Sequence, residues 1–173
     1  MRVIVTDYNP QWPDIFEVEA NRLREVFGEE LIAVHHIGST SVPGLKAKPI
    51  IDIMPVVRDI KVVDEFNDKM MGLAYEPVGE CGIPGRRYFR KGEEVRTHQI
   101  HIFQINSRDI ERHLAFRDFL RQHAYEAKKY GELKVKLADH FPNDIEAYMD
   151  GKDDFIKNLE QTAIKWHGEI LIP

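Results

Sequence analysis

The chain has 173 residues, of which 43% are hydrophobic and 31% charged, and its formal net charge is −5. This composition is typical of a globular protein rather than a disordered one, and the length fits a single domain over residues 1–173. The acidic balance argues against strong binding to duplex nucleic acid, because that binding needs a clustered excess of Lys and Arg.

The first third of the chain predicts a strand and a helix, followed by two strands around an unusual turn. Residues 3–7 have the pattern of a short strand, and apolar residues at helical spacing predict a helix over residues 14–27, stopped by the glycine that follows. Two apolar runs, residues 31–37 and 50–57, are read as strands. The Gly-Ser-Thr-Ser segment at residues 38–41 then predicts a loop of phosphate size between them.

The middle of the chain predicts one helix and three strands. Apolar spacing indicates a helix over residues 59–71 and a strand over residues 73–78. Residues 86–91 and 95–105 are read as two strands of a hairpin, with a Lys-Gly-Glu-Glu turn between them.

The remainder is predicted to be helical, after a cap at residues 106–107 and with breaks at residues 141–144 and 150–152. This layout predicts an α+β domain with a small mixed β-sheet flanked by helices and a helical C-terminal third.

The chemistry is concentrated between the Gly-Ser-Thr-Ser turn and Asp52. Backbone N–H groups and hydroxyls in such a turn suit a bound phosphate. The candidate phosphate-binding residues there are Gly38, Ser39, Thr40 and Ser41. Asp52 interrupts an apolar strand, where a carboxylate is costly unless it is paired, hydrated or bound to a cation. The plain alternatives are a capped turn and a buried aspartate that caps it or pairs with a lysine.

Lysines and arginines elsewhere are candidates for the same ligand. Lys48, Lys134 and Arg86 are candidate phosphate contacts, although surface lysines usually only solvate a fold. Arg96 belongs to an arginine group on two predicted strands, where some guanidinium groups are expected to face one pocket.

Three histidines are candidate supporting residues. His36 directly precedes the turn and is expected to orient it. His98 and His101 differ by three residues, so on a regular strand they face opposite sides of the sheet. One of them is placed to approach Asp52 from a neighbouring strand, and an ordinary hydrogen-bonded histidine is the alternative for both.

The aromatic side chains of Trp12, Phe116 and Tyr130 are predicted to be core rather than platforms for stacking a base. The one cysteine, Cys81, excludes an internal disulfide and a multi-thiolate zinc site. The start of the chain has no apolar segment of signal-peptide length, and no run is long enough to span a bilayer. We therefore expect a cytoplasmic protein without a membrane partner.

Ser39 precedes Asp52 by thirteen residues, and this spacing resembles the nucleotidyltransferase superfamily related to DNA polymerase beta. In that superfamily a Gly-Ser turn holds the nucleotide's phosphates, and two carboxylates at positions i and i+2 of the next strand bind a divalent metal. The resemblance implies that Asp52 is a catalytic residue and a ligand of Mg²⁺ or another divalent cation. The second position of the pair is Met54, which cannot replace a carboxylate for a hard cation.

A longer resemblance is to the GrpB family. It rests above all on His-Ile-Gly-Ser-Thr-Ser-Val-Pro-Gly-Leu at residues 36–45 and Ala-Lys-Pro-Ile-Ile-Asp-Ile at residues 47–53, and it continues to residues 147–152. The resemblance implies a nucleotidyltransferase-like fold and an accessory role near nucleotide or coenzyme metabolism, since relatives occur fused to dephospho-coenzyme A kinase.

Two hypotheses follow for function. In the first, the protein binds a nucleotide or another phosphorylated small molecule and transfers a nucleotidyl group with Mg²⁺ at Asp52. In the second, it is a non-catalytic nucleotide-binding or accessory module linked to coenzyme A or nucleotide metabolism, which the missing second acid favours. A hydrolase with Ser39 or Ser41 as nucleophile ranks below both, because the chain has no G-x-S-x-G motif.

Overall fold

The structure, a computed structural model, describes residues 2–170. Its strands are β1 (Leu31–Ile37), β2 (Ile51–Val57), β3 (Glu76–Gly79), β4 (Arg87–Lys91) and β5 (His98–Gln104). Its α-helices are α1 (Trp12–Phe27), α2 (Asn67–Gly72), α3 (Arg108–Gln122), α4 (Ala124–His140) and α5 (Ile145–Ile170). Short 3₁₀ segments lie at Gly28–Glu30, Ser39–Ser41 and Ile60–Phe66. The α+β fold with a helical C-terminal third is therefore as the sequence predicts.

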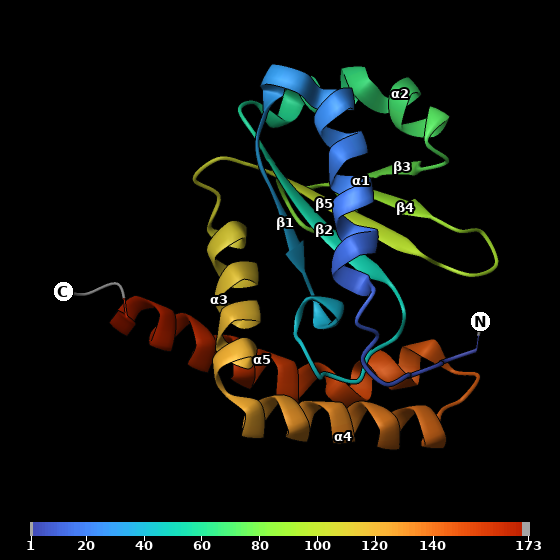
Figure 1. Ribbon diagram of the computed structural model, residues 1–173, viewed down its shortest axis with the longest axis vertical. Helices are drawn as coiled ribbons and strands as arrows, with labels where there is room; N and C mark the ends of the chain where they lie inside the picture. The colour runs from blue at the N-terminus through green and yellow to red at the C-terminus, as the bar shows by residue number, and fades with distance from the viewer. Residues whose placement is uncertain (1, 171–173) are drawn as a thin grey trace.

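The strands form one five-stranded mixed sheet in the order β1-β2-β5-β4-β3 (Figure 1). β2 pairs antiparallel with β1 and parallel with β5, and the remaining pairs are antiparallel. In this register Asp52 lies between Ile37 of β1 and Gln99 of β5. The aspartate is therefore in the middle of the sheet, next to the end of β1 from which the Gly-Ser turn leaves.

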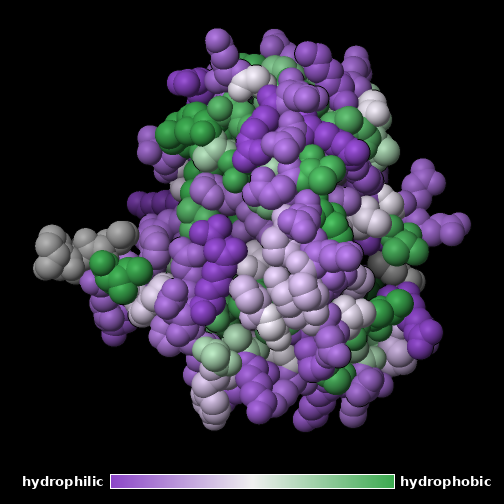
Figure 2. Space-filling model, viewed as in Figure 1, coloured by the Kyte–Doolittle hydropathy of each residue, from purple (hydrophilic) through white to green (hydrophobic). Residues whose placement is uncertain are grey.

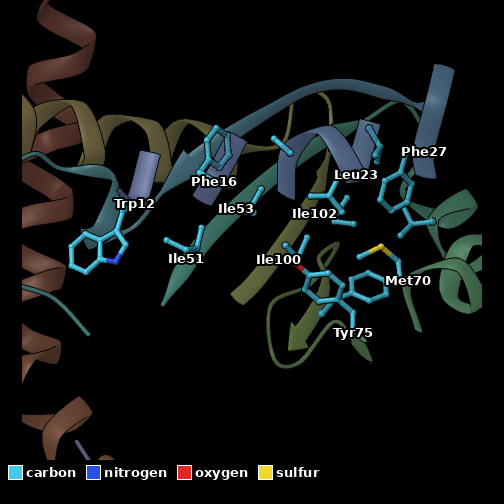
Figure 3. Packing of buried hydrophobic residues seen from close by; sticks show 14 of the residues in the cluster. Trp12, Phe16, Leu23, Phe27, Ile51, Ile53, Met70, Tyr75, Ile100 and Ile102 are labelled. Carbon is cyan, nitrogen blue, oxygen red and sulfur yellow. The ribbon is translucent and has the colours of Figure 1, made fainter. Parts of the chain in front are cut away.

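One face of the sheet is covered by α1, and the packing there is apolar. The stripe Trp12, Phe16 and Leu23 of α1 packs against residues of β2 and β5 such as Ile53 and Ile100 (Figure 3). Pro13 lies in the first turn of α1 and Gly28, with φ of +51°, ends it, because a residue without Cβ adopts this backbone conformation easily. Apolar packing therefore joins α1 to this face of the sheet.

The opposite face meets α3. Met54 and Phe103 pack there against Ile110 and Leu114 of α3. Ser107 caps that helix by accepting a hydrogen bond from the backbone N–H of Asp109. Because alternate side chains of a strand share a face, Asp52 lies on the same side as Met54. The strand therefore presents its aspartate toward the C-terminal helices.

Four predictions differ from the structure. The break expected at residues 150–152 lies inside the continuous helix α5. Residues 3–7 do not form a strand; they make a single bridge, Thr6 with Ala47. Residues 59–71 are mostly a 3₁₀ segment followed by the short α2. The strand predicted over residues 73–78 begins only at Glu76, because the backbone N–H groups of residues 73–75 bond to carbonyls at the end of α2.

The outer surface seen in Figure 2 is largely hydrophilic, with hydrophobic residues scattered between polar ones. Across residues 2–170, every helix is too short or too polar to cross a lipid bilayer.

Candidate functional site

A cavity of about 250 Å³ opens between the Asp52 face of the sheet and the C-terminal helices. Its wall combines the turn after β1, the strands β2 and β5, and the helices α3, α4 and α5. The cavity thus joins segments more than a hundred residues apart in sequence, and Figure 1 shows α4 and α5 crossing below the end of the sheet where the turn lies.

The turn is built around Gly38. This residue has φ of +73°, and a Cβ placed on it would lie 2.6 Å from Oδ2 of Asp52. Both the backbone conformation and the close approach of the carboxylate therefore require glycine. Only a residue without a side chain allows the turn to lie directly against Asp52.

The three hydroxyls of the turn have different partners. Ser41 Oγ donates a hydrogen bond to the carbonyl of Gly38, and Thr40 Oγ1 donates one to the carbonyl of Ile50 at 3.2 Å. These two side chains hold the turn together. The Ser41 hydroxyl, which was predicted to contact phosphate, is used within the turn and does not line the cavity. Ser39, by contrast, lines the cavity, as do Gly38 and Thr40.

His36 orients the turn, as predicted from its position. Its Nε2 lies 3.0 Å from Thr40 Oγ1, and because that hydroxyl already donates to Ile50, the histidine must be the donor. The ring stacks on Phe16 with centroids 4.8 Å apart. Burial lowers the pKa of His36 to about 4, so the ring is neutral at physiological pH.

Helix α3 anchors the turn through the main chain. Arg117 donates a hydrogen bond to the carbonyl of His36 at 3.2 Å, and Arg121 donates one to the carbonyl of Ser41 at 2.9 Å. The two residues that flank the turn are therefore tied to the same helix.

Asp52 is hydrogen-bonded to His101, which reaches it from the neighbouring strand. His101 Nε2 lies 3.0 Å from Asp52 Oδ1, and His101 Nδ1 lies 3.3 Å from Nη1 of Arg86. A guanidinium can only donate, so Nδ1 accepts and Nε2 carries the proton given to Asp52. The order Arg86–His101–Asp52 therefore fixes the orientation in which Nε2 of His101 donates to the carboxylate.

Arg86 itself lies behind His101 and is not part of the cavity wall. Its other nitrogens donate to the carbonyls of Glu80 and Cys81, at 3.1 and 2.8 Å. The guanidinium predicted to bind phosphate is thus used within the protein, and its role here is to orient His101.

Two other predicted supporting residues lie outside the cavity. His98 faces the α1 side of the sheet, where its ring lies 6.4 Å from that of Tyr75. Arg96 precedes β5 and lines a separate surface depression near Arg90. One of the two histidines was expected to approach Asp52, and the period of two along β5 makes His101 that histidine, while His98 faces the other side of the sheet.

Three lysines gather on the cavity wall opposite the sheet. Lys134 of α4 is 2% exposed, and its Nζ lies 4.3 Å from the centre of the Tyr130 ring. Lys152 of α5 is 8% exposed, and its Nζ lies 4.9 Å from the ring centre of Tyr148. Lys48 Nζ lies 5.4 Å from the centre of that same Tyr148 ring. The site therefore combines three ammonium groups with two tyrosine rings.

Burial lowers the pKa of all three lysines, and for Lys134 and Lys152 the charges of neighbouring lysines lower it further. Burial and the charges of Lys152 and Lys48 lower the pKa of Lys134 to about 6. Burial and Lys48 lower the pKa of Lys152 to about 8, and burial lowers that of Lys48 as well, while Asp52 opposes both shifts. Among the described residues, nothing accepts a hydrogen bond from Lys134 Nζ, and the Tyr148 hydroxyl also has no partner. Such a cluster suits an anion.

The residues around Asp52 do not fit the metal site of the resemblance. Met54, at the position of the second carboxylate, is fully buried beneath α3. Within residues 2–170 no group of three His, Cys, Asp or Glu side chains is arranged to hold a metal ion. On β2, a resident divalent ion would find Asp52 as its single carboxylate ligand, with one oxygen already bound to His101.

Sequence reasoning missed several residues of the wall. Lys152 and Tyr148 were not candidates, and both line the cavity. Phe116 and Tyr130 belong to a hydrophobic cluster, as predicted, and they also line the cavity. Trp12 is in the core under α1, as predicted. A signal was present, since a tyrosine precedes each buried lysine of α4 and α5 by four residues, which places the pair on one helix face.

The mixed sheet and the Gly-Ser turn packed on Asp52 define a nucleotidyltransferase-like fold. A crystal structure of the Cid1 poly(U) polymerase with MgGTP bound superposes with a TM-score of 0.51 at 13% identity, over 76% of this chain and 43% of that chain. At this identity the similarity shows the fold alone.

The family is defined more closely. The GrpB protein family model matches residues 2–162, and the chain belongs to the GrpB family. The crystal structure of conserved protein GrpB from Enterococcus faecalis superposes with a TM-score of 0.92 at 48% identity, over 95% of this chain and 99% of that one.

Two curated relatives are longer than this chain. The UPF0157 protein YqkA of Bacillus subtilis is 48% identical over 95% of this chain, and the match spans 48% of that protein's length. A dephospho-CoA kinase of Mycolicibacterium paratuberculosis is 25% identical over 91% of this chain and 45% of its own length. The chain thus spans about half the length of each.

Proposed function

We propose that this chain binds the phosphate groups of a nucleotide or another phosphorylated small molecule in the cavity between Ser39 and Lys134. The observation that carries the proposal is the ammonium group of Lys134, which is buried, lines the cavity and has no acceptor among the described residues. An unsatisfied buried polar group costs roughly 1–3 kcal/mol, and more when it is charged. A phosphate oxygen beside Lys134 would remove that cost.

The rest of the wall supports the same kind of ligand. Lys48 and Lys152 add positive charge, and the Tyr148 hydroxyl adds a donor without a partner among the described residues. Phe116 and Ile156 give the cavity an apolar side on which the organic part of a ligand can pack. The relative named as a dephospho-CoA kinase adds dephospho-coenzyme A to the compounds worth testing.

Binding is better supported than nucleotidyl transfer. Metal-assisted transfer in the resembling superfamily needs a carboxylate pair, and β2 offers Asp52 alone. Both original hypotheses, the transferase and the accessory module, require the binding step, so the proposal rests on what they share.

Calorimetry with nucleoside triphosphates, dephospho-coenzyme A and pyrophosphate, each with and without MgCl₂, tests the proposal. At least one compound is expected to bind, and Lys134→Met is expected to weaken it at least about tenfold, which is roughly 1.4 kcal/mol. Lys128→Met is the matched control, because Lys128 is exposed on the same helix. Absence of binding for the whole panel in both conditions would refute the proposal, and release of pyrophosphate in the same samples would add transfer to it.

Anion affinity is expected to fall as the pH rises above about 7. In the free protein Lys134 has a pKa of about 6, so it is mostly neutral there, whereas an anion binds the ammonium form. Binding must then take up a proton, which lowers affinity by up to about tenfold per pH unit. Sulfate is the appropriate probe, because it does not titrate in this range. A sulfate affinity that is independent of pH, or that falls equally in Lys134→Met, would contradict the assignment to Lys134.

A further inference from the structure

We propose that the cavity binds a di- or triphosphate in its metal-free form, with Lys48 and Lys152 supplying the positive charge that a divalent cation supplies elsewhere. This inference rests on the proposed function and specifies which form of the ligand the site takes. It departs from the magnesium site that the resemblance implies, and it is based on the hydrogen bond between Asp52 and His101 and on the position of Met54.

One carboxylate oxygen of Asp52 is already hydrogen-bonded. Oδ1 accepts the proton of His101 Nε2, and Arg86 holds that histidine in the donating tautomer. Oδ2 lies beside the turn, so close to Gly38 that a Cβ there would be 2.6 Å away. A cation bound to Oδ1 would face the N–H of His101, which leaves Oδ2 as the one oxygen of Asp52 that β2 offers to a cation.

Met54, at the position of the second carboxylate in the resembling superfamily, cannot bind a metal ion. Met54 is fully buried among Phe103, Ile110 and Leu114, so its side chain belongs to the packing under α3. A thioether is a soft donor and does not replace an oxygen ligand for magnesium. No other residue of β2 on this face compensates, because the next alternate position, Val56, is apolar and buried.

The two lysines provide the missing charge in the right place. Lys48 and Lys152 lie over the same Tyr148 ring, at 5.4 and 4.9 Å, and both line the cavity together with Asp52. Their two ammonium groups together carry the charge of one divalent ion. Lysine binds phosphate as a compact point charge, which does not demand the fixed octahedral geometry of magnesium. A metal complex of the ligand would bring further positive charge toward an already cationic wall.

Pyrophosphate binding measured by calorimetry in EDTA and at increasing MgCl₂ tests the inference. The tightest binding is expected in EDTA, and affinity is expected to fall as magnesium complexes the ligand. An affinity that rises tenfold or more with magnesium would overturn the inference while leaving the proposed function intact. If pyrophosphate binds under neither condition, the inference fails, and the triphosphates decide whether the proposed function fails with it.

Two variants sharpen the test. Asp52→Asn keeps an oxygen that can accept from His101 but removes the charge that repels phosphate, so it is expected to bind pyrophosphate several-fold more tightly in EDTA. If Asp52 were a metal ligand, the same variant would instead lose pyrophosphate binding in the presence of MgCl₂. Lys48→Met is expected to weaken metal-free binding at least about tenfold. Lys46→Met is its control, since the exposed Lys46 pairs with Asp7 outside the cavity.

Discussion

Replacing Lys134 by methionine is expected to raise the free energy of unfolding by about 2 kcal/mol at pH 7, although the same change is expected to weaken ligand binding at least about tenfold. Methionine keeps an unbranched apolar stem but has no ammonium group to desolvate. Each unit by which burial lowers a lysine pKa corresponds to about 1.4 kcal/mol. Loss of the contact between the Lys134 amino group and the Tyr130 ring offsets part of the gain.

The pH dependence of this effect has a definite sign. Between the pKa of about 6 in the folded protein and the ordinary value near 10.5, the unfolded chain binds more protons at Lys134. Wild-type stability therefore rises with pH across this window, and the advantage of Lys134→Met shrinks toward its upper end. Urea unfolding followed by circular dichroism at several pH values measures both. Lys128→Met should stay within about 0.5 kcal/mol of wild type. A Lys134→Met protein less stable than wild type would contradict this account.

A substitution that stabilises the free protein but weakens ligand binding would indicate that Lys134 serves binding at a cost to stability. Residues that lower the stability of the free protein are common at functional sites, where the ligand later supplies the missing partner. The same reasoning predicts a smaller gain for Lys152→Met, because the pKa of Lys152 is lowered only to about 8.

Replacing Gly38 by alanine is expected to destabilise the fold by about 3 kcal/mol or more. A positive φ costs a residue with Cβ roughly 1–2 kcal/mol, and the new Cβ would also meet Asp52 Oδ2 at 2.6 Å. The turn, or Asp52 with its hydrogen bond to His101, would have to move. Chemical denaturation measures the loss of stability, and calorimetry measures the loss of ligand binding. Stability and ligand binding are expected to fall together.

Gly44 provides a matched control for this substitution. It has φ of +82°, but no atom lies within 4 Å of the position its Cβ would take. Gly44→Ala therefore isolates the backbone cost, expected to be about 1–2 kcal/mol. Equal losses for Gly38→Ala and Gly44→Ala would show that contact with Asp52 contributes nothing. The double variant Gly38→Ala with Asp52→Ala should recover part of the loss, since it removes the clashing oxygen.

The sequence predicts the elements around the turn well, because their signals are local and strong. The strand over residues 31–37 has the predicted bounds, and α1 ends at the predicted glycine. The apolar run interrupted by Asp52 is β2, the strand that lies between β1 and β5. The helix predicted over residues 59–71 was less reliable, because apolar spacing there does not distinguish a 3₁₀ segment from an α-helix.

The lysine cluster could not be derived in the same way. A tyrosine followed four residues later by a lysine occurs three times in the helical third. These pairs are Tyr125 with Lys129, Tyr130 with Lys134, and Tyr148 with Lys152. Their local geometry is alike, with each ammonium over its ring, but Tyr125 is 69% exposed while the other two pairs are buried at the cavity. Only the packing of α4 and α5 under the sheet distinguishes the two pairs that line the cavity from the pair on the surface.

The roles of the hydroxyls and of Arg86 also depend on tertiary structure. Nothing local indicates that Thr40 donates to the carbonyl of residue 50, or that Arg86 serves His101 rather than a ligand. The prediction that a histidine approaches Asp52 from a neighbouring strand needed one fact that the sequence lacks, namely that β2 and β5 are neighbours.

Arg117 and Arg121 hold the turn by the carbonyl oxygens of His36 and Ser41, which every amino acid provides. These two hydrogen bonds to α3 therefore do not depend on the side chains of the residues between His36 and Ser41. Position 39, which lines the cavity, can therefore be substituted without loss of these two hydrogen bonds.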